Sequence, residues 1–261
     1  MSLYPPPPPG WDSRILIAAP EQADLEQRLV TWAQARGYEY NPQPSVDWYQ
    51  SWAPFVFLFK PTRVSREVRA SFGDAQLWMI ETVDDSKTKT GEESRYVLSF
   101  LLSPRLHYRA ALRSRMQKDA IDEMRTSINP RKTPRSLGRW RWRERDQFLR
   151  RTYGRGVRGV IGDAIFEAHC EIATPSREEG LAALPVALRQ WLLTTGWRGV
   201  LELRPGGLVS TTYGPPLFDP ASLDATVHHL GHVFNAVTRK KDANEPPPSS
   251  GPMSGPYFRN G

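Results

Sequence analysis

The chain of 261 residues has a formal net charge of +7 and 39% hydrophobic residues, which fits one large domain or two small ones with a real core. No apolar run approaches the roughly 18 residues that span a membrane, and the N-terminus lacks the basic and apolar regions of a secretory signal. The single cysteine, Cys170, excludes an intramolecular disulfide framework, so we expect a cytoplasmic protein, and the excess of arginine over lysine suits a GC-rich bacterial genome.

The chain begins with a proline tract. Its five consecutive prolines favour polyproline II structure, and we expect residues 1–13 to be disordered. A predicted N-terminal half, residues 14–127, opens with a short strand at Arg14–Ala19. A helix is expected from Pro20 to a stop at Gly37, with an apolar stripe formed by Leu25, Leu29, Trp32 and Ala33.

Strands dominate the rest of this half. Residues 46–61 are aromatic and apolar, and this pattern fits a helix or a strand. Clearer strands are predicted at residues 63–72, 75–83 and 94–102, and the first two are joined tightly at Gly73-Asp74. Ser103-Pro104 has the composition of a helix start, so we expect a helix from there to about Ser127.

The middle of the chain is strongly basic. From Arg105 to Arg158 there are 17 Lys and Arg against 5 Asp and Glu, a local excess of +12, while the remainder has 18 against 23. Within it, residues 128–153 read as a linker that interleaves arginine with tryptophan. This pattern suits single-stranded nucleic acid, bound through residues 131–158, or an anionic membrane surface. Alternatively, both tryptophans pack onto one of the halves. The candidate binding residues are Arg139, Trp140, Arg141, Trp142, Arg143 and Arg145.

A C-terminal half is predicted at residues 154–238. Alternation over Phe166, Ala168, Cys170 and Ile172 predicts a half-buried strand. We expect a helix from Thr174-Pro175 to Gly196, bent at Pro185, then a hairpin over residues 200–213 and a last helix from Asp219-Pro220 to about Val237. The Pro-, Ser- and Gly-rich tail, residues 239–261, is expected to be disordered.

A short internal match suggests an old duplication. Residues 68–75 and 157–164 share Val, Arg, Gly, Asp and Ala at the same offsets. We interpret Asp74 and Asp163 as turn residues of two equivalent hairpins rather than as paired functional carboxylates. The predicted fold is therefore α+β, with two related halves, each an antiparallel sheet with helices on one face, joined by the basic linker.

Three near-motifs do not predict chemistry. His228 and His232 have the spacing of a two-histidine chelate, but a histidine stands where the general base would be, and the cluster is expected on a solvated face opposite the apolar one. The glycines of residues 154–159 follow a charged segment and precede a strand, so they do not match a dinucleotide loop. His169 and Cys170 are strand neighbours that point to opposite faces, which excludes a catalytic dyad. We therefore predict no metal site, no cofactor and no catalytic residues.

These observations favour a non-enzymatic cytosolic binding or scaffold protein whose partner is an unknown protein. The alternative is a protein that binds single-stranded nucleic acid through the basic middle segment. A third hypothesis is a hydrolytic enzyme with no identifiable site, since no acid, base and nucleophile assemble in the sequence. The oligomeric state stays open.

Overall fold

The computed structural model describes residues 16–17, 23–44, 52, 55–58, 63–84, 94–115, 160–212 and 218–238. In this part of the chain, one nine-stranded sheet runs through the molecule in the order β1-β3-β4-β5-β9-β8-β6-β7, and β2 pairs with β3 beside β1. Pairing is antiparallel except between β1 and β3. The strands are β1 (Leu16–Ile17), β2 (Glu39–Asn41), β3 (Arg63–Phe72), β4 (Ala75–Asp84), β5 (Ser94–Leu102), β6 (Ala110–Ser114), β7 (Cys170–Ala173), β8 (Gly199–Arg204) and β9 (Gly207–Thr212).

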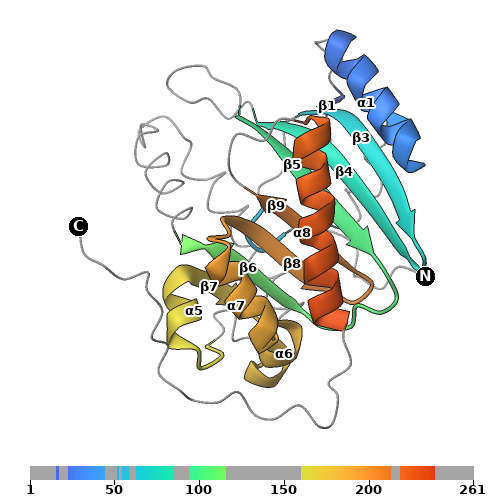
Figure 1. Ribbon diagram of the computed structural model, residues 1–261. Helices are drawn as coiled ribbons and strands as arrows, with labels where there is room; N and C mark the ends of the chain where they lie inside the picture. The colour runs from blue at the N-terminus through green and yellow to red at the C-terminus, as the bar shows by residue number, and fades with distance from the viewer. Residues whose placement is uncertain are drawn as a thin grey trace, which may run out of the picture.

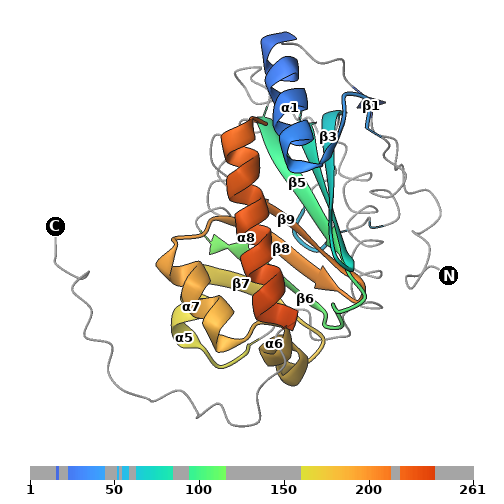
Figure 2. The ribbon, with the colours of Figure 1, turned by 45° about the vertical axis from the view of Figure 1, so that its right-hand side comes forward.

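Five helices of the described residues cover one face of this sheet, as Figures 1 and 2 show. They are α1 (Ala23–Arg36), α5 (Ala164–His169), α6 (Arg177–Ala183), α7 (Val186–Thr194) and α8 (Pro220–Thr238). The apolar face of α8 lies across the middle of the sheet, with Leu223, Leu230 and Val233 fully buried. These side chains share one core with the α1 residues Leu29 and Trp32. The α+β class predicted from the sequence is confirmed.

The opposite face of the sheet is covered in part by described residues of the stretch between β2 and β3. Trp52 and residues 55–58 pack there in a second core, against Val200, Phe100 and Val209 among others. A buried ion pair between Glu202 and Arg204 holds these residues against the sheet. Glu202 accepts a hydrogen bond of 2.8 Å from the backbone N–H of Val56, and Arg204 donates one of 2.6 Å to the carbonyl of Trp52. The guanidinium of Arg204 also lies over the rings of Trp52 and Phe55.

The two predicted halves meet within the same sheet. β5 pairs with β9 in the register Ser99↔Ser210, so a strand of the N-terminal half and one of the C-terminal half are direct neighbours. β6 comes from residues assigned to the N-terminal half, yet it lies between β7 and β8 of the C-terminal half. The structure therefore does not confirm two separate halves with a sheet each. The basic linker, residues 128–153, lies outside the described residues, as do the predicted tails 1–13 and 239–261.

The helix predicted from Ser103-Pro104 is wrong over residues 103–114. The backbone N–H of Arg105 does bond to the Ser103 hydroxyl at 3.2 Å, but only a turn follows. Residues 110–114 then form β6, and all five are buried. Alanine and leucine favour a helix locally, yet hydrogen bonds to two flanking strands and complete burial outweigh that weak preference.

The second Gly-Asp copy is not a hairpin. Asp163 is the N-cap of α5, where its carboxylate accepts a hydrogen bond from the N–H of Phe166 at 3.1 Å. The strand predicted from the alternation around Cys170 is thus partly wrong, because it begins only at Cys170 itself. The helix expected from Thr174-Pro175 is two helices, α6 with Ser176 as N-cap and α7 after Pro185. Proline lacks the N–H that a continuous helix would need there.

Candidate binding surface

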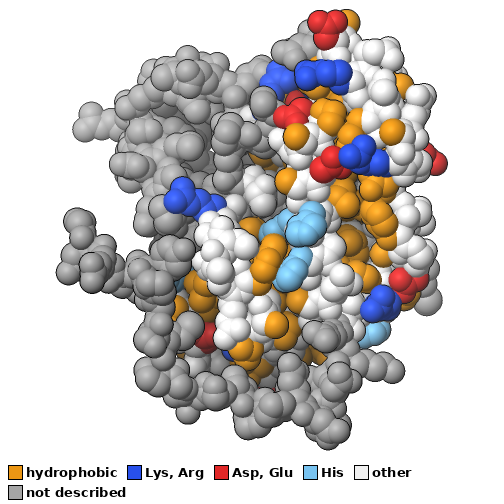
Figure 3. All heavy atoms as spheres, viewed as in Figure 1, with side chains coloured by type: hydrophobic (Ala, Val, Ile, Leu, Met, Phe, Trp, Pro, Cys, Tyr) orange, Lys and Arg blue, Asp and Glu red, His pale blue; other side chains and the backbone are white. Residues whose placement is uncertain are grey.

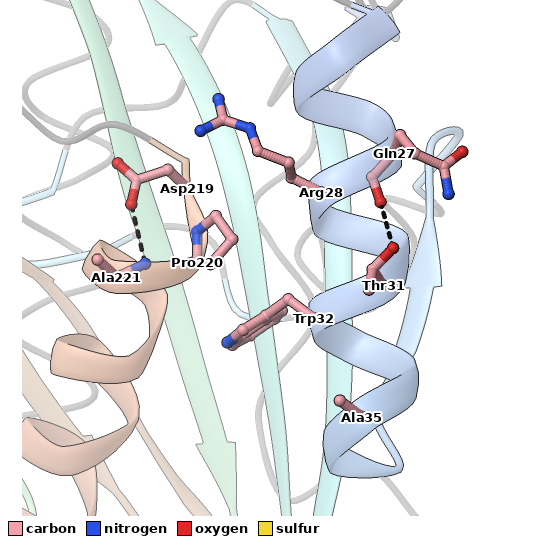
Figure 4. Close-up of a pocket in the computed structure, with 8 residues that line it drawn as sticks. All are labelled: Gln27, Arg28, Thr31, Trp32, Ala35, Asp219, Pro220 and Ala221. Carbon is pink, nitrogen blue, oxygen red and sulfur yellow. Dashed lines mark hydrogen bonds between the residues drawn. The ribbon is translucent and has the colours of Figure 1, made fainter.

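A shallow groove separates α1 from the beginning of α8 on the helix-covered face (Figure 4). Its cavity volume is about 560 Å³. In the figure, Arg28 and Trp32 leave α1 on the same side and point toward the first turn of α8, where Asp219 and Pro220 lie. Residues four apart on a helix share a face, which explains this common direction. Gln27, Thr31 and Ala35 complete the α1 side.

Asp224 ties the two helices together below the groove. Its Oδ1 accepts a hydrogen bond of 3.1 Å from the indole N–H of Trp32, and its Oδ2 accepts one of 2.7 Å from Arg36. The Arg36 guanidinium also lies 5.2 Å from the centre of the Trp32 ring. The ring of Trp32 is therefore fixed by α8 and closes the bottom of the groove with only 6% of its surface exposed.

Asp219 is occupied in the same way. As the N-cap residue of α8, it accepts hydrogen bonds from the N–H groups of Ala221 and Ser222 at 2.9 and 3.1 Å, and from the Ser222 hydroxyl at 3.1 Å. Arg28, by contrast, is exposed and takes part in no hydrogen bond or ion pair within the described part of the chain. The groove therefore presents one uncommitted positive charge beside carboxylates that are already satisfied.

A second feature of this face is an aromatic cluster between α7 and α8, which we call the Trp–His surface. It comprises Trp191, Trp197, His228, His229 and His232. The His232 ring stacks on Trp191 with 4.2 Å between ring centres, and the His229 ring lies 5.0 Å from Trp191. Figure 3 shows pale-blue histidines gathered over α8, with orange hydrophobic side chains beside them.

The histidines are thus only partly on a solvated face, which corrects the sequence-based expectation. His228 and His232 are exposed, but His229 is largely covered. Burial, followed by the charges of His232 and His228, lowers the pKa of His229 to about 4. In the described residues, neither Nε2 of His229 nor Nε1 of Trp197 has a hydrogen-bond partner. His229 is therefore a neutral packing residue at neutral pH.

Charge is sparse on this surface, where exposed Arg198 follows Trp197. After Asp224, no Asp, Glu, Lys or Arg follows in α8, and in α7 the single charged residue is Arg189. Arg189 is buried and forms an ion pair of 2.9 Å with Asp163. The exposed α7–α8 surface is therefore made of aromatic, imidazole and small uncharged side chains, a composition typical of the core of a protein–protein interface.

Several residues singled out in the sequence do not come together as a site. Cys170 is buried, and burial raises the pKa of its thiol to about 12, so the thiol stays protonated. His169 is exposed and its Nδ1 lies 2.8 Å from the carbonyl of Ile165 within α5. No group of three or more His, Cys, Asp or Glu side chains in the described ranges is placed to hold a metal ion.

The strongest sequence candidates lie elsewhere. Arg139, Trp140, Arg141, Trp142, Arg143 and Arg145 are outside the described residues, as is the glycine-rich stretch 154–159. The groove was not predicted, although its α1 side contains the helical stripe residue Trp32. A stripe on one helix marks the buried face but does not reveal which distant helix meets it.

Within the described residues, no helix is at once long and apolar enough to cross a membrane. No family model and no curated protein matches the chain. Among solved structures, the chain is similar to the crystal structure of the mycobacterial trehalose monomycolate transport factor A, with a TM-score of 0.50 and 11% sequence identity over 84% of this chain and 96% of that one. At this identity the likeness is one of fold, and the chain shares its fold with that transport factor.

Proposed function

We propose that the chain is a non-enzymatic binding protein that holds a protein partner against the Trp–His surface. The observation that carries this proposal is the combination, on one exposed two-helix face, of half-buried tryptophans with very little charge. Interface cores are depleted in charged residues and enriched in aromatic ones, whereas a surface that only faces water is normally rich in charge.

The individual side chains suit an interface centre. Trp191 is partly buried against the core and stacked on His232, so its ring is held in place before any partner arrives. A fixed tryptophan loses little conformational entropy on binding, and tryptophan is among the residues that contribute most to protein–protein affinity. Exposed Gln190 and Asn235 border the cluster and supply polar groups for a rim.

The fold likeness supports the same class of function. The similar structure is that of a transport factor. We infer a binding role for this chain, with the identity of the partner protein left to experiment. A fold hosts many functions, so the surface itself remains the main support.

Site-specific photo-crosslinking in the cell tests this proposal. A photoreactive amino acid replaces Gln190, beside Trp191, or as a control Phe72, which is exposed on β3. We expect one discrete protein adduct from position 190, which disappears when Trp191→Ala is added, and no such adduct from position 72. Equal adducts from both positions, or none from position 190, would contradict a specific interface.

A second candidate function rests on charge. The excess of +12 between Arg105 and Arg158 is large enough to attract a polyanion. Binding of single-stranded nucleic acid through residues 131–158 therefore remains a proposal with its own test, given in the Discussion.

A further inference from the structure

The groove between α1 and α8 lies at the end of α8 away from the Trp–His surface and has the properties of a small-ligand site. Its volume of about 560 Å³ falls within the roughly 300–1,000 Å³ of ligand pockets in proteins. Half of its eight lining residues are polar, but most of the surface that they expose to the groove is apolar. A ligand that fits must therefore be mostly apolar.

The charges around the groove point to the sign of that ligand. Asp224 accepts hydrogen bonds from Trp32 and Arg36, and Asp219 accepts them from the first turn of α8, so both carboxylates already have donors within the protein, although Asp219 keeps its negative charge. The guanidinium of Arg28 has no such partner in the described residues and projects across the groove (Figure 4). Guanidinium binds carboxylates through paired hydrogen bonds.

The positions of the two α1 side chains also fix how the ligand would lie. Arg28 stands one helical turn before Trp32, and Ala35 follows in the next turn on the same side of the groove. A carboxylate bound to Arg28 would therefore have apolar surface next to it along the helix axis, which rises by about 1.5 Å per residue. The small side chains of Ala35 and Ala221 leave room for an alkyl chain along the groove.

We propose that this groove binds an anionic amphiphile, a carboxylate on a linear alkyl chain, with the carboxylate on Arg28 and the chain along Trp32, Ala35 and Pro220. This ligand site is independent of the protein partner proposed for the Trp–His surface. Failure of the one test therefore leaves the other untouched.

Sodium decanoate is the probe, titrated into the full chain below its aggregation concentration and followed by isothermal calorimetry. We expect saturable binding to one site. Arg28→Gln should weaken the affinity at least about tenfold, because it removes a charge-assisted contact. Asp219→Asn should strengthen it a few-fold, because asparagine still caps the helix while the competing negative charge is lost. Arg198→Gln, at another exposed arginine without a partner in the described chain, is the matched control and should change nothing.

Two further titrations separate charge from chain. Sodium acetate should not saturate the site, since it lacks the apolar part, and decyltrimethylammonium should bind at least tenfold more weakly than decanoate. Ala35→Trp fills the groove and should abolish binding, with melting temperature and circular dichroism used to show that it folds. If Ala35→Trp does not fold, the decanoate affinity of Arg28→Gln still tests the proposal, because Arg28 is exposed and its replacement should not affect folding. Equal affinity of wild type and Arg28→Gln for decanoate, or equal affinity for decanoate and the cationic amphiphile, would overturn the proposal.

Discussion

The indole N–H of Trp32 on α1 donates a hydrogen bond of 3.1 Å to Oδ1 of Asp224 on α8, a residue 192 positions later in the chain. The other oxygen of Asp224 holds Arg36 in an ion pair that is largely exposed, with 38% and 44% of the two side chains accessible. One carboxylate therefore joins the first and last helices of the described chain by two contacts of different strength.

This difference in strength can be measured. Asp224→Ala should lower the free energy of unfolding by about 1–2 kcal/mol, because it leaves the partly buried indole N–H without an acceptor. Arg36→Gln should lower it by less than about 0.5 kcal/mol, since exposed ion pairs contribute little. Urea unfolding of both variants provides the comparison. Equal losses would mean that the bond to Trp32 adds no stability.

The two Gly-Asp copies should respond similarly to substitution of the glycine. Gly73, in the β3–β4 turn, and Gly162, before α5, both have positive φ values of +62° and +87°, so alanine should cost on the order of 1 kcal/mol at either position. At Gly162 the new Cβ would lie 2.7 Å from the guanidinium of exposed Arg177, whose flexible side chain can move aside, so the two costs should be similar. Urea unfolding of both variants measures them.

The aspartates that follow these glycines should differ clearly. Asp74→Asn should have little effect, because Asp74 is about half exposed and its ion pair with Arg105 is long, at 4.0 Å. Asp163→Asn keeps a capping side chain but leaves the buried Arg189 without its counter-charge, so we expect a loss of several kcal/mol. Chemical denaturation of both variants checks this. If the two losses are equally small, Asp163 is only a turn residue, as the sequence suggested.

The pKa of His229 predicts a pH dependence of stability. Its pKa is about 4 in the folded chain, against about 6.5 when unfolded. Between these two pH values the unfolded chain binds a proton that the folded chain does not. The titration of His229 therefore leaves the free energy of unfolding unchanged above about pH 6.5 and lowers it as the pH drops toward 4. The loss at the low end should reach about 3 kcal/mol. His229→Phe should flatten the curve of unfolding free energy against pH in this window. The control His228→Gln, at an exposed histidine, should keep most of the wild-type slope.

The Trp–His surface should not bind a structural metal. His232 is stacked on Trp191 and His229 is half-buried, and the described His side chains are not placed together to hold a metal ion. Purified protein should contain no stoichiometric zinc by elemental analysis, and a chelator should leave the melting temperature unchanged. One tightly bound zinc ion per chain would disprove this.

The basic middle segment has a test of its own. If it binds single-stranded nucleic acid, Trp140→Ala and Trp142→Ala should each weaken binding by roughly 1–3 kcal/mol through lost stacking. Replacing Arg139, Arg141 and Arg143 by alanine should also reduce the salt dependence of the affinity. Fluorescence polarization with a labelled oligonucleotide, at low and high salt, measures both effects. An absence of binding at low salt, together with destabilised tryptophan variants, would instead indicate that this segment packs internally.

The sequence by itself determined the elements whose signals are local. The helix carrying Leu29 and Trp32, its end at Gly37, the hairpin turn at Gly73 and the start of α8 at Asp219 were all predicted and are all present. Each depends on residues within a few positions of one another, through a cap, a turn conformation or a helical stripe. These local patterns predict an element without any knowledge of where the rest of the chain lies.

Only the tertiary structure decided which distant segments meet. It placed residues 110–114 as a strand between β7 and β8, although their local sequence favours a helix, and it paired Ser99 with Ser210 to make one sheet. It also brought Arg28 opposite Asp219 to form the groove, and Trp191 against His232. These contacts join positions far apart in the chain. Several strand and helix pairings are compatible with the hydrophobic pattern, and the observed one is selected by burial and close packing summed over many contacts. The order of apolar and polar residues along the chain does not specify those contacts.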